Sequence, residues 1–153
     1  MADLDHFKRL NDTLGHHTGD AALRQFADAV RSAARAADLV ARWGGEEFMF
    51  VLPNANADQA LEWVARLRAH LAATQAATST TVFTASFGLA DTTMAQSLED
   101  LVRIADAALY CSKDGGRDRG TIGNPAMATG GGKRHPSEHG AQVNLRLLAN
   151  EVG

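Results

Sequence analysis

The chain has 153 residues, of which 45% are hydrophobic and 22% are charged, and its net charge is −3. This length and composition fit one globular domain with a single core. The small negative charge gives no general attraction to nucleic acid, so no nucleic-acid partner is expected and any phosphate binding must come from locally placed groups.

The sequence contains no apolar run that approaches the roughly 18 residues needed to span a bilayer, and its polar start does not resemble a signal peptide. We therefore expect no membrane segment and a cytoplasmic location. The single cysteine, Cys111, excludes an internal disulfide and cannot form a thiolate metal cluster alone. Its helical surroundings favour a plain packing role.

Polar and charged residues crowd the first 20 positions of the chain. This stretch has the pattern of a strand end that runs into a turn of helix and then into a loop broken by Gly15 and Gly19. From Asp20 to Ala34, apolar residues recur at helical spacing, which predicts an amphipathic helix. Asp20 is the expected N-terminal cap or first-turn acid of that helix.

Two apolar runs, Leu39 to Trp43 and Phe48 to Leu52, flank a Gly-Gly-Glu-Glu tetrapeptide at positions 44–47. This pattern predicts a β-hairpin whose turn presents acidic groups. The adjacent carboxylates of Glu46 and Glu47 repel each other unless a cation or a proton lies between them, so the arrangement is costly without a partner. The alternative is a solvent-facing hairpin tip without a function.

Three further elements follow the hairpin. Apolar residues recur at helical spacing from about 56 to 73, which predicts a second amphipathic helix. Residues 81–90 alternate in the manner of a half-buried strand. Ser97 begins a capping box that opens a third helix, with Lys113 in its last turn and two glycines, Gly115 and Gly116, at its end.

The composition changes after Ile122, because residues 123–153 contain two of the prolines, many glycines and no aromatic residue. We predict a domain over residues 1–122 and a flexible C-terminal tail over 123–153, with a short helix from Gln142 to Asn150. One strand before Asp3 would complete the order β-α-β-β-α-β. The predicted fold class is therefore α+β, a ferredoxin-like plait with helices on one face of an antiparallel sheet.

Short motifs spread over most of the chain have a recognisable order and spacing. They are Asp3-Leu4-Asp5-His6-Phe7-Lys8, Asn11-Asp12, Gly15-His16, Gly19-Asp20, Gly44 to Phe48, Ser86-Phe87-Gly88, Ala105-Asp106, Tyr110, Lys113 and Gly116-Arg117. Over roughly residues 1–122, the chain resembles the GGDEF domain. That family comprises the diguanylate cyclases, which make cyclic di-GMP from two GTP, and the resemblance implies a relative of the nucleotidyl cyclase and polymerase palm.

The resemblance implies a Mg²⁺ or Mn²⁺ site formed by Asp3, the backbone carbonyl of Leu4 and Glu46, with Glu47 close by. Magnesium is a hard ion that is usually held by one or two carboxylates together with substrate phosphates. Bound metal would polarise the α-phosphate and lower the pKa of the attacking 3′-hydroxyl, for which Glu46 is the family's candidate proton acceptor. Without the resemblance, Asp3 would be interpreted as an exposed terminal charge.

The resemblance also implies a set of GTP contacts. They are Phe7, Lys8, Asn11, His16, Asp20, Gly44, Gly45, Lys113 and Arg117. Asn and Asp suit guanine because the base offers both donors and acceptors, whereas Lys and Arg bind phosphate oxygens. The alternatives are that Asn11 and Asp20 only cap turns, and that Lys113 is a surface lysine at a helix C-terminus.

Arg35 and Asp38 precede the hairpin at the place where many GGDEF domains carry an Arg-x-x-Asp site for inhibition by the product, cyclic di-GMP. An arginine fork can engage the O6 and N7 edge of guanine, and a carboxylate can accept from its amino groups. Arg42 could assist. Considered alone, an arginine at a helix end followed by an acidic turn is a common surface feature.

The chain departs from the family at its start, where members have an apolar strand before the Asp3 position. We therefore expect a first strand that is largely missing, with Asp3 and Leu4 on a frayed terminus. Asp118 stands where the family usually has Asn. Two functions remain open: a diguanylate cyclase that works as a homodimer, because two GTP half-sites must face each other, and a non-catalytic remnant or module that binds cyclic di-GMP or GTP.

Overall fold

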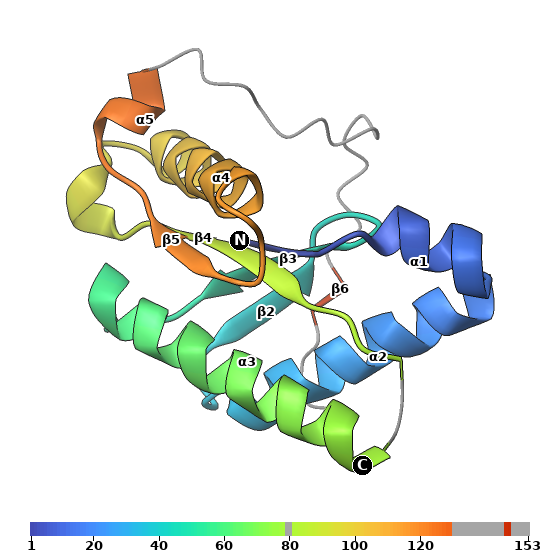
Figure 1. Cartoon of the computed structure of the whole chain (residues 1–153). Helices are drawn as coiled ribbons and strands as arrows, with labels where there is room; N and C mark the ends of the chain where they lie inside the picture. Colours follow the sequence, from blue (N-terminus) through green and yellow to red (C-terminus); the bar gives the residue numbers. More distant parts are fainter. Residues whose placement is uncertain (79–80, 130–145, 148–153) are drawn as a thin grey trace.

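The computed structural model describes residues 1–78, 81–129 and 146–147. The described strands form one six-stranded sheet in the order β5-β4-β1-β3-β2-β6 (Figure 1). The strands are β1 Ala2–Leu4, β2 Leu39–Arg42, β3 Glu47–Val51, β4 Ala85–Leu89, β5 Gly120–Ile122 and β6 Arg146–Leu147. The helices are α1 Phe7–Leu14, α2 His16–Ala33, α3 Ala57–Thr78, α4 Leu98–Asp114 and α5 Ala126–Thr129, with a 3₁₀ turn at Thr92–Met94.

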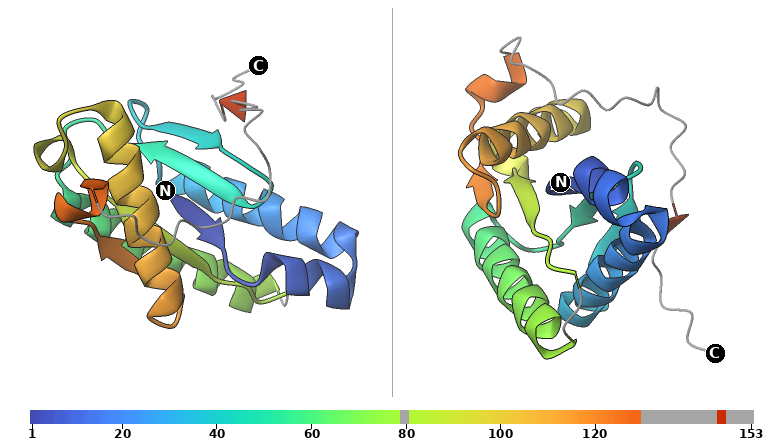
Figure 2. Two further views of the ribbon diagram at one scale, coloured as in Figure 1. Left: turned by 90° about the horizontal axis from the view of Figure 1, so that it is seen from above. Right: turned by 45° about the vertical axis from the view of Figure 1, so that its right-hand side comes forward.

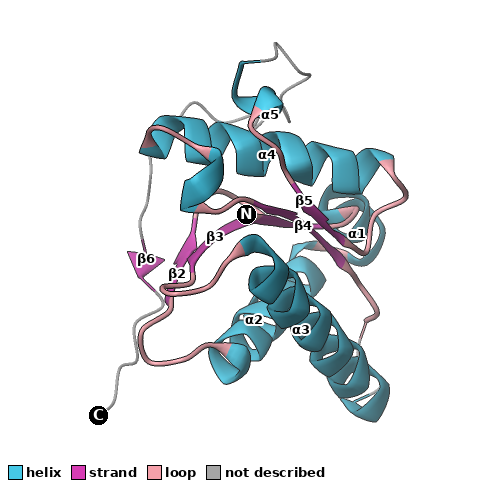
Figure 3. Cartoon of the chain, turned by 90° about the vertical axis from the view of Figure 1, so that its left-hand side faces the viewer, coloured by secondary structure: helices cyan, strands magenta, loops and turns pink. Residues whose placement is uncertain are grey.

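Helices cover both faces of the sheet. Figure 3 shows α2 and α3 on one face and α4 on the opposite face. The expectation of helices on one face only is therefore wrong. The reason is visible in β4, whose five residues are all buried and do not alternate, because α4 packs on the side of this strand that faces away from α2 and α3.

The first strand is short, but it is the centre of the sheet. β1 pairs antiparallel with β3 on one side, where Asp3 lies opposite Glu47, and with β4 on the other, where Asp3 lies opposite Ser86. Asp3 and Leu4 are each only 1% exposed. The expectation of a frayed terminus is wrong, because two neighbouring strands hydrogen-bond this segment at once.

The polar start of the chain forms two helices and not a loop. Gly15, at φ 83°, separates α1 from α2 and supplies the positive φ of the turn. Gly19 and Asp20 lie inside α2, so the predictions of a break at Gly19 and of a cap at Asp20 are wrong. Gly19 has a packing role instead, because a Cβ there would lie 1.9 Å from the side-chain oxygen of Asn11 on α1.

The core beneath the sheet contains a cluster of aromatic rings among its aliphatic side chains. The ring of Phe26 on α2 meets Phe48 of β3 edge to face at 4.8 Å, and Phe50 lies 5.4 Å from Trp63 of α3. The indole Nε1 of Trp63 donates to the Ala33 carbonyl at 3.0 Å, which ties α3 to the end of α2. Such pairs contribute about 0.5–1.5 kcal/mol each beyond their buried area.

The hairpin and the third predicted helix are confirmed. β2 and β3 pair antiparallel from Leu39 opposite Val51 to Arg42 opposite Phe48. The Ser97 hydroxyl caps α4 by accepting from the Asp100 amide at 3.1 Å. β5 was not predicted as a strand, and it pairs parallel with β4.

The segment after Ile122 contacts the domain where it is described. α5 packs against α4, and β6 pairs with β2. Arg146–Leu147 form a strand, so the predicted helix from Gln142 to Asn150 is wrong there, and the rest of it lies outside the described residues. The domain boundary at 122 stays a prediction. None of the described helices is long and apolar enough to cross a lipid bilayer.

The backbones of β4 and α4 touch at Gly88. A Cβ at this position would lie 2.0 Å from the Ala105 carbonyl oxygen and 2.3 Å from the Leu109 nitrogen. We expect Gly88→Ala to lower the free energy of unfolding by about 3 kcal/mol, because the clash is with backbone that cannot rotate away. Urea unfolding measures this.

The matched control is Gly45→Ala, since a Cβ at Gly45 meets nothing within 4 Å. Its unfolding free energy should stay within about 0.5 kcal/mol of the parent value. Equal stability of the two variants would show that the helix and the strand are not in backbone contact.

Candidate active site

Two acidic side chains lie side by side at the end of the central strands. Asp3 of β1 is directly opposite Glu47 of β3, and the Leu4 amide donates to the Glu46 carbonyl at 3.2 Å. Residues opposite each other on antiparallel strands point to the same face of the sheet. Asp3 and Glu47 are buried and Glu46 is half-buried, so the structure brings together the acidic residues that the sequence singled out.

The hairpin glycines have different roles. A Cβ at Gly44 would lie 2.6 Å from a carboxylate oxygen of Glu47, so only glycine leaves room for that side chain. Gly45 has open space beside it. The Arg42 guanidinium holds the turn by donating to the carbonyl oxygens of Gly44 at 3.1 Å and Gly45 at 2.5 Å.

A lysine on α4 neutralises the charge of the buried Asp3 carboxylate. The Lys113 ammonium, in the last turn of α4, lies 2.8 Å from Asp3 Oδ2, and the two side chains are 11% and 2% exposed. The alternative of a surface lysine at a helix end is therefore wrong. A buried carboxylate requires such a partner because removal of a charge from water costs several kcal/mol.

The oxygen donors at this place suit a hard divalent cation. Asp3, Glu46, Glu47 and the Leu4 carbonyl come from two paired strands. Among the residues that the structure describes, no group of three or more His, Cys, Asp or Glu side chains is arranged to hold a metal ion alone. A divalent cation held by one or two carboxylates usually completes its coordination with water and substrate phosphates.

The remaining substrate candidates line α1, α2 and the loop after α4. Figure 2 shows α1 and α2 side by side beyond the end of β1. Lys8, His16 and Asp20 are exposed, whereas Phe7 is buried against Gly19. The side-chain oxygen of Asn11 is buried and has no hydrogen-bond partner among the described residues, so its amide retains unused hydrogen-bonding capacity.

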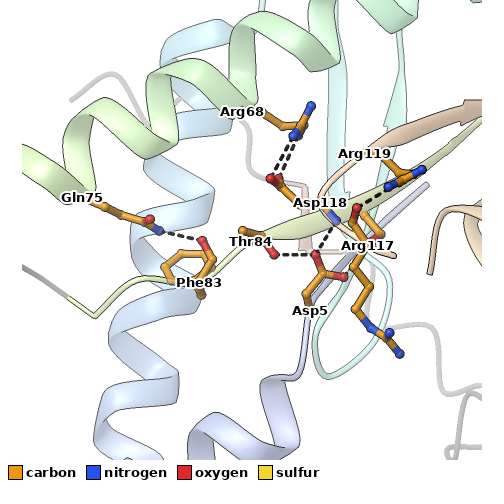
Figure 4. A network of polar contacts seen from close by, with 9 residues as sticks. Asp5, Arg68, Gln75, Phe83, Thr84, Arg117, Asp118 and Arg119 are labelled. Carbon is orange, nitrogen blue, oxygen red and sulfur yellow. Dashed lines mark hydrogen bonds and ion pairs between the residues drawn. The ribbon is translucent and has the colours of Figure 1, made fainter. Parts of the chain in front are cut away.

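The glycine-rich loop after α4 has an unusual backbone. Gly116, Arg117 and Asp118 have φ values of 110°, 64° and 46° in succession. The Arg117 amide donates to the Ser112 carbonyl at 2.9 Å, and in Figure 4 the Arg117 side chain extends away from the Asp5 carboxylate. A guanidinium can bind phosphate oxygens through two of its donors, and the phosphate contact of Arg117 stays a prediction.

A family model described as "Diguanylate cyclase, GGDEF domain" matches residues 1–119. The chain belongs to the GGDEF family. This GGDEF domain is 40% identical over 119 residues to the diguanylate cyclase DgcM of Escherichia coli, covering 78% of the chain and 29% of DgcM. It is also 40% identical over 121 residues to DgcP of Pseudomonas aeruginosa, covering 78% of the chain and 18% of DgcP. The chain thus spans less than a third of the length of these relatives.

Solved structures of GGDEF domains have the same fold. The GGDEF domain of TpbB, also called YfiN, from Pseudomonas aeruginosa superposes with a TM-score of 0.75 at 32% identity, over 84% of this chain and 77% of that one. The DgcB domain from Caulobacter crescentus, in complex with c-di-GMP, gives 0.68 at 34% identity, over 79% and 74%. An active GGEEF domain from Vibrio cholerae gives 0.72 at 30% identity, over 80% of each chain.

Sequence reasoning gave no role to Asp5, which follows Asp3 by two residues in this GGDEF domain. Its carboxylate is buried and accepts hydrogen bonds from the Ser86 hydroxyl and, as Figure 4 shows, from the Thr84 hydroxyl and the Asp118 amide. The signal available in the sequence was the Asp-x-Asp spacing, because residues two apart along a strand share a face.

A pocket of about 140 Å³ has a lining that includes none of the residues of the acidic cluster. Arg35 and Asp38 line it together with Glu62 and Arg66 of α3, and the Arg35 amide donates to Asp38 Oδ2 at 2.7 Å. The structure therefore brings the two predicted product-site residues together, whereas Arg42 holds the hairpin turn and does not line this pocket. Arg66 was missed, although its spacing from Glu62 places both on one face of α3.

We expect Lys113→Met to lower the free energy of unfolding by about 3 kcal/mol or more, because it leaves the buried Asp3 carboxylate without its cation. Addition of Mg²⁺ should then raise the melting temperature of this variant more than that of the parent chain, since the ion compensates the same charge. Thermal unfolding with and without Mg²⁺ measures both effects.

Lys8→Met serves as the control, because Lys8 is exposed and its loss should change stability by no more than about 0.5 kcal/mol. The importance of the pair would be contradicted by a Lys113→Met variant as stable as the Lys8→Met variant.

Proposed function

We propose that this chain is the catalytic domain of a diguanylate cyclase, which joins two GTP molecules into cyclic di-GMP and releases pyrophosphate. The observation that carries the proposal is the placement of Asp3 opposite Glu47, with Glu46 beside it and Lys113 at 2.8 Å. Acidic oxygen ligands and a cation at one point are the components that phosphoryl transfer requires. The family relationship of the whole segment from 1 to 119 supports the same activity.

In this proposal Asp3, the Leu4 carbonyl and Glu46 hold Mg²⁺ or Mn²⁺. When bound, the ion supplies polarisation of the α-phosphate and neutralisation of the leaving pyrophosphate. Lys8, Lys113 and Arg117 bind the phosphate oxygens. Lys113 therefore exchanges its contact with Asp3 for one with the triphosphate.

Glu46 is the proposed acceptor for the proton of the attacking 3′-hydroxyl. It is half-buried at the hairpin tip, next to the buried Glu47. Phe7, Gly44 and Gly45 form the walls that the nucleotide contacts. A carboxylate that accepts this proton while phosphate charge is neutralised nearby raises the rate of attack.

Guanine recognition is assigned to Asn11 and Asp20, with His16 beside them on α2. The unpartnered Asn11 oxygen supports this assignment, because a buried polar group without a partner is costly unless a ligand compensates. Asp20 is exposed and its carboxylate can accept from the two donors of the guanine edge.

One chain holds one GTP in this scheme, so the reaction needs a homodimer in which two half-sites face each other.

The product then has a second role. We assign the pocket of Arg35, Asp38 and Arg66 to cyclic di-GMP as an inhibitor, which is supported by the two arginines and two carboxylates that line it. The DgcB structure in complex with c-di-GMP supports a product-binding role in this family.

The second candidate function is a module that binds cyclic di-GMP without making it. The contact of Lys113 with Asp3 favours it, because the lysine lies where the metal would bind. The two functions differ in turnover. They agree on product binding at Arg35 and Asp38.

Glu46→Ala should reduce formation of cyclic di-GMP from GTP and Mg²⁺ by at least about a hundredfold, because it removes both a metal ligand and the proton acceptor. Chromatographic product analysis at high protein concentration measures the rate. Glu99→Ala is the matched control, because Glu99 is exposed on α4 and pairs with Arg103 one turn along the same helix. No turnover by the parent chain would remove the cyclase and leave the binding module.

Arg35→Ala should weaken cyclic di-GMP binding by about tenfold or more, because one arginine fork on guanine contributes about 1–3 kcal/mol. Titration calorimetry measures the affinity. Arg31→Ala is the control, since Arg31 lies one turn before Arg35, in the last turn of α2, and pairs with Asp28 outside the pocket. Equal affinities of the two variants would exclude this pocket as the product site.

A further inference from the structure

Asp5 is a buried carboxylate to which the proposed reaction gives no role. It is 6% exposed and follows β1 directly. Its Oδ1 accepts from the Ser86 hydroxyl at 2.7 Å. Its Oδ2 accepts from the Thr84 hydroxyl at 2.6 Å and the Asp118 amide at 3.1 Å (Figure 4). Two of these donors belong to the strand β4 and its approach, and the third belongs to the loop after α4.

That loop adopts a conformation that its residues do not favour by themselves. Arg117 and Asp118 are both in the left-handed region, which non-glycine residues rarely adopt and which persists only where the surroundings hold it. Something must therefore hold Asp118. The contact from Asp5 is made to the backbone of Asp118 itself, next to the peptide that carries Arg117.

The loop has other contacts, but they are made elsewhere than to the Asp118 backbone. The Arg119 guanidinium donates to the Arg117 carbonyl at 3.0 Å, and the Arg117 amide donates to the Ser112 carbonyl at 2.9 Å. The Arg68 guanidinium pairs with the Asp118 carboxylate at 2.9 Å, but the two side chains are 33% and 50% exposed. The pair is bidentate, because Arg68 Nε also donates to Asp118 Oδ1 at 2.9 Å, but it holds the side chain of Asp118 and is open to water. The hydrogen bond to the buried Asp5 carboxylate is charge-assisted and is made to the Asp118 backbone itself.

We propose that Asp5 is a positioning residue for the triphosphate ligand Arg117. By holding the Asp118 amide, Asp5 fixes the left-handed backbone that presents the Arg117 guanidinium. Asp5 is two residues from Asp3, so one strand end sets the separation between the metal ligand and the phosphate ligand. The inference rests on the proposed function for the role of Arg117.

A purely structural role for Asp5 makes a different prediction. The Thr84 hydroxyl donates to the same Asp5 carboxylate oxygen as the Asp118 amide, and this hydrogen bond is made to Asp5 and not to the loop. Loss of the Thr84 contact should therefore lower stability without moving Arg117. Thr84→Val is the matched control for Asp5→Ala.

Replacement of Asp5 by asparagine should keep the contact with the Asp118 amide. Its side-chain oxygen can accept from the Asp118 amide, while its amide nitrogen donates to the Ser86 hydroxyl, which can also act as an acceptor. Asp5→Asn should therefore behave like the parent chain, although it has no charge.

The experiment measures two quantities on the full chain: the exchange rate of the Asp118 amide hydrogen by NMR, and the Kd of a non-hydrolysable GTP analogue with Mg²⁺ by calorimetry. For Asp5→Ala we expect faster exchange at Asp118 and a Kd raised about tenfold, the scale of one lost phosphate contact. Asp5→Asn and Thr84→Val should stay within about twofold of the parent Kd. Combining Asp5→Ala with Arg117→Ala should add nothing to the effect of Arg117→Ala alone.

Multiplying effects in the double variant, or a Thr84→Val effect as large as that of Asp5→Ala, would overturn the inference. If Arg117→Ala itself leaves the Kd unchanged, the phosphate role in the proposed function is wrong and the inference falls with it. In that case the exchange rate of the Asp118 amide, which is measured without nucleotide, still shows whether Asp5 holds the loop, so failure of the proposed function can be told apart from failure of the Asp5 contact. If Asp5→Ala does not fold, Asp5→Ser replaces it, because its shorter side chain keeps a hydroxyl for Ser86 but does not reach the Asp118 amide.

Discussion

The position of β1 between β3 and β4 is the constraint on which the site depends. A strand of three residues contributes few side chains to the core, yet its backbone is hydrogen-bonded on both sides. Because of this double pairing, Asp3 is carried into the interior and held opposite Glu47 without freedom of register. A one-residue slip would turn Asp3 to the other face of the sheet and Leu4 into its place. The chemistry of the site is therefore set by strand register before any side chain is considered.

Three carboxylates are buried within a few residues of this strand, namely those of Asp3, Asp5 and Glu47. The burial of two of them is compensated in different ways: Asp3 has the ammonium of Lys113, and Asp5 has hydroxyl and amide donors. The Glu47 side chain fits because Gly44 has no Cβ. Replacement of such groups by apolar residues would often be neutral or stabilising. Their presence indicates that this part of the fold serves binding more than stability.

The sequence alone was sufficient where the determining interactions are local. The hairpin around Gly44 and Gly45 and the Ser97 cap depend on residues within a few positions, and both were predicted correctly. The glycine inside α2 was misinterpreted, because Gly19 is required by Asn11 on another helix. Helices on both faces, β5 and the Asp5 contacts depend on residues far apart in the chain, so no periodicity could reveal them. Among the site residues, the family pattern singled out Asp3, Glu46 and Lys113, whose roles stay predictions, and it did not indicate that Lys113 pairs with Asp3.

The backbone contact between β4 and α4 at Gly88 bears on how Asp3 can change its partner. β4 is hydrogen-bonded to β1, and α4 lies against β4 with no room for a Cβ between them, so the strand of Asp3 and the helix of Lys113 are packed backbone to backbone. The two charged groups can therefore separate by rotation about their side-chain bonds, without displacement of the helix from the strand. Such rotations take picoseconds to nanoseconds in exposed residues, and this range is a lower bound for a pair whose side chains are only 11% and 2% exposed.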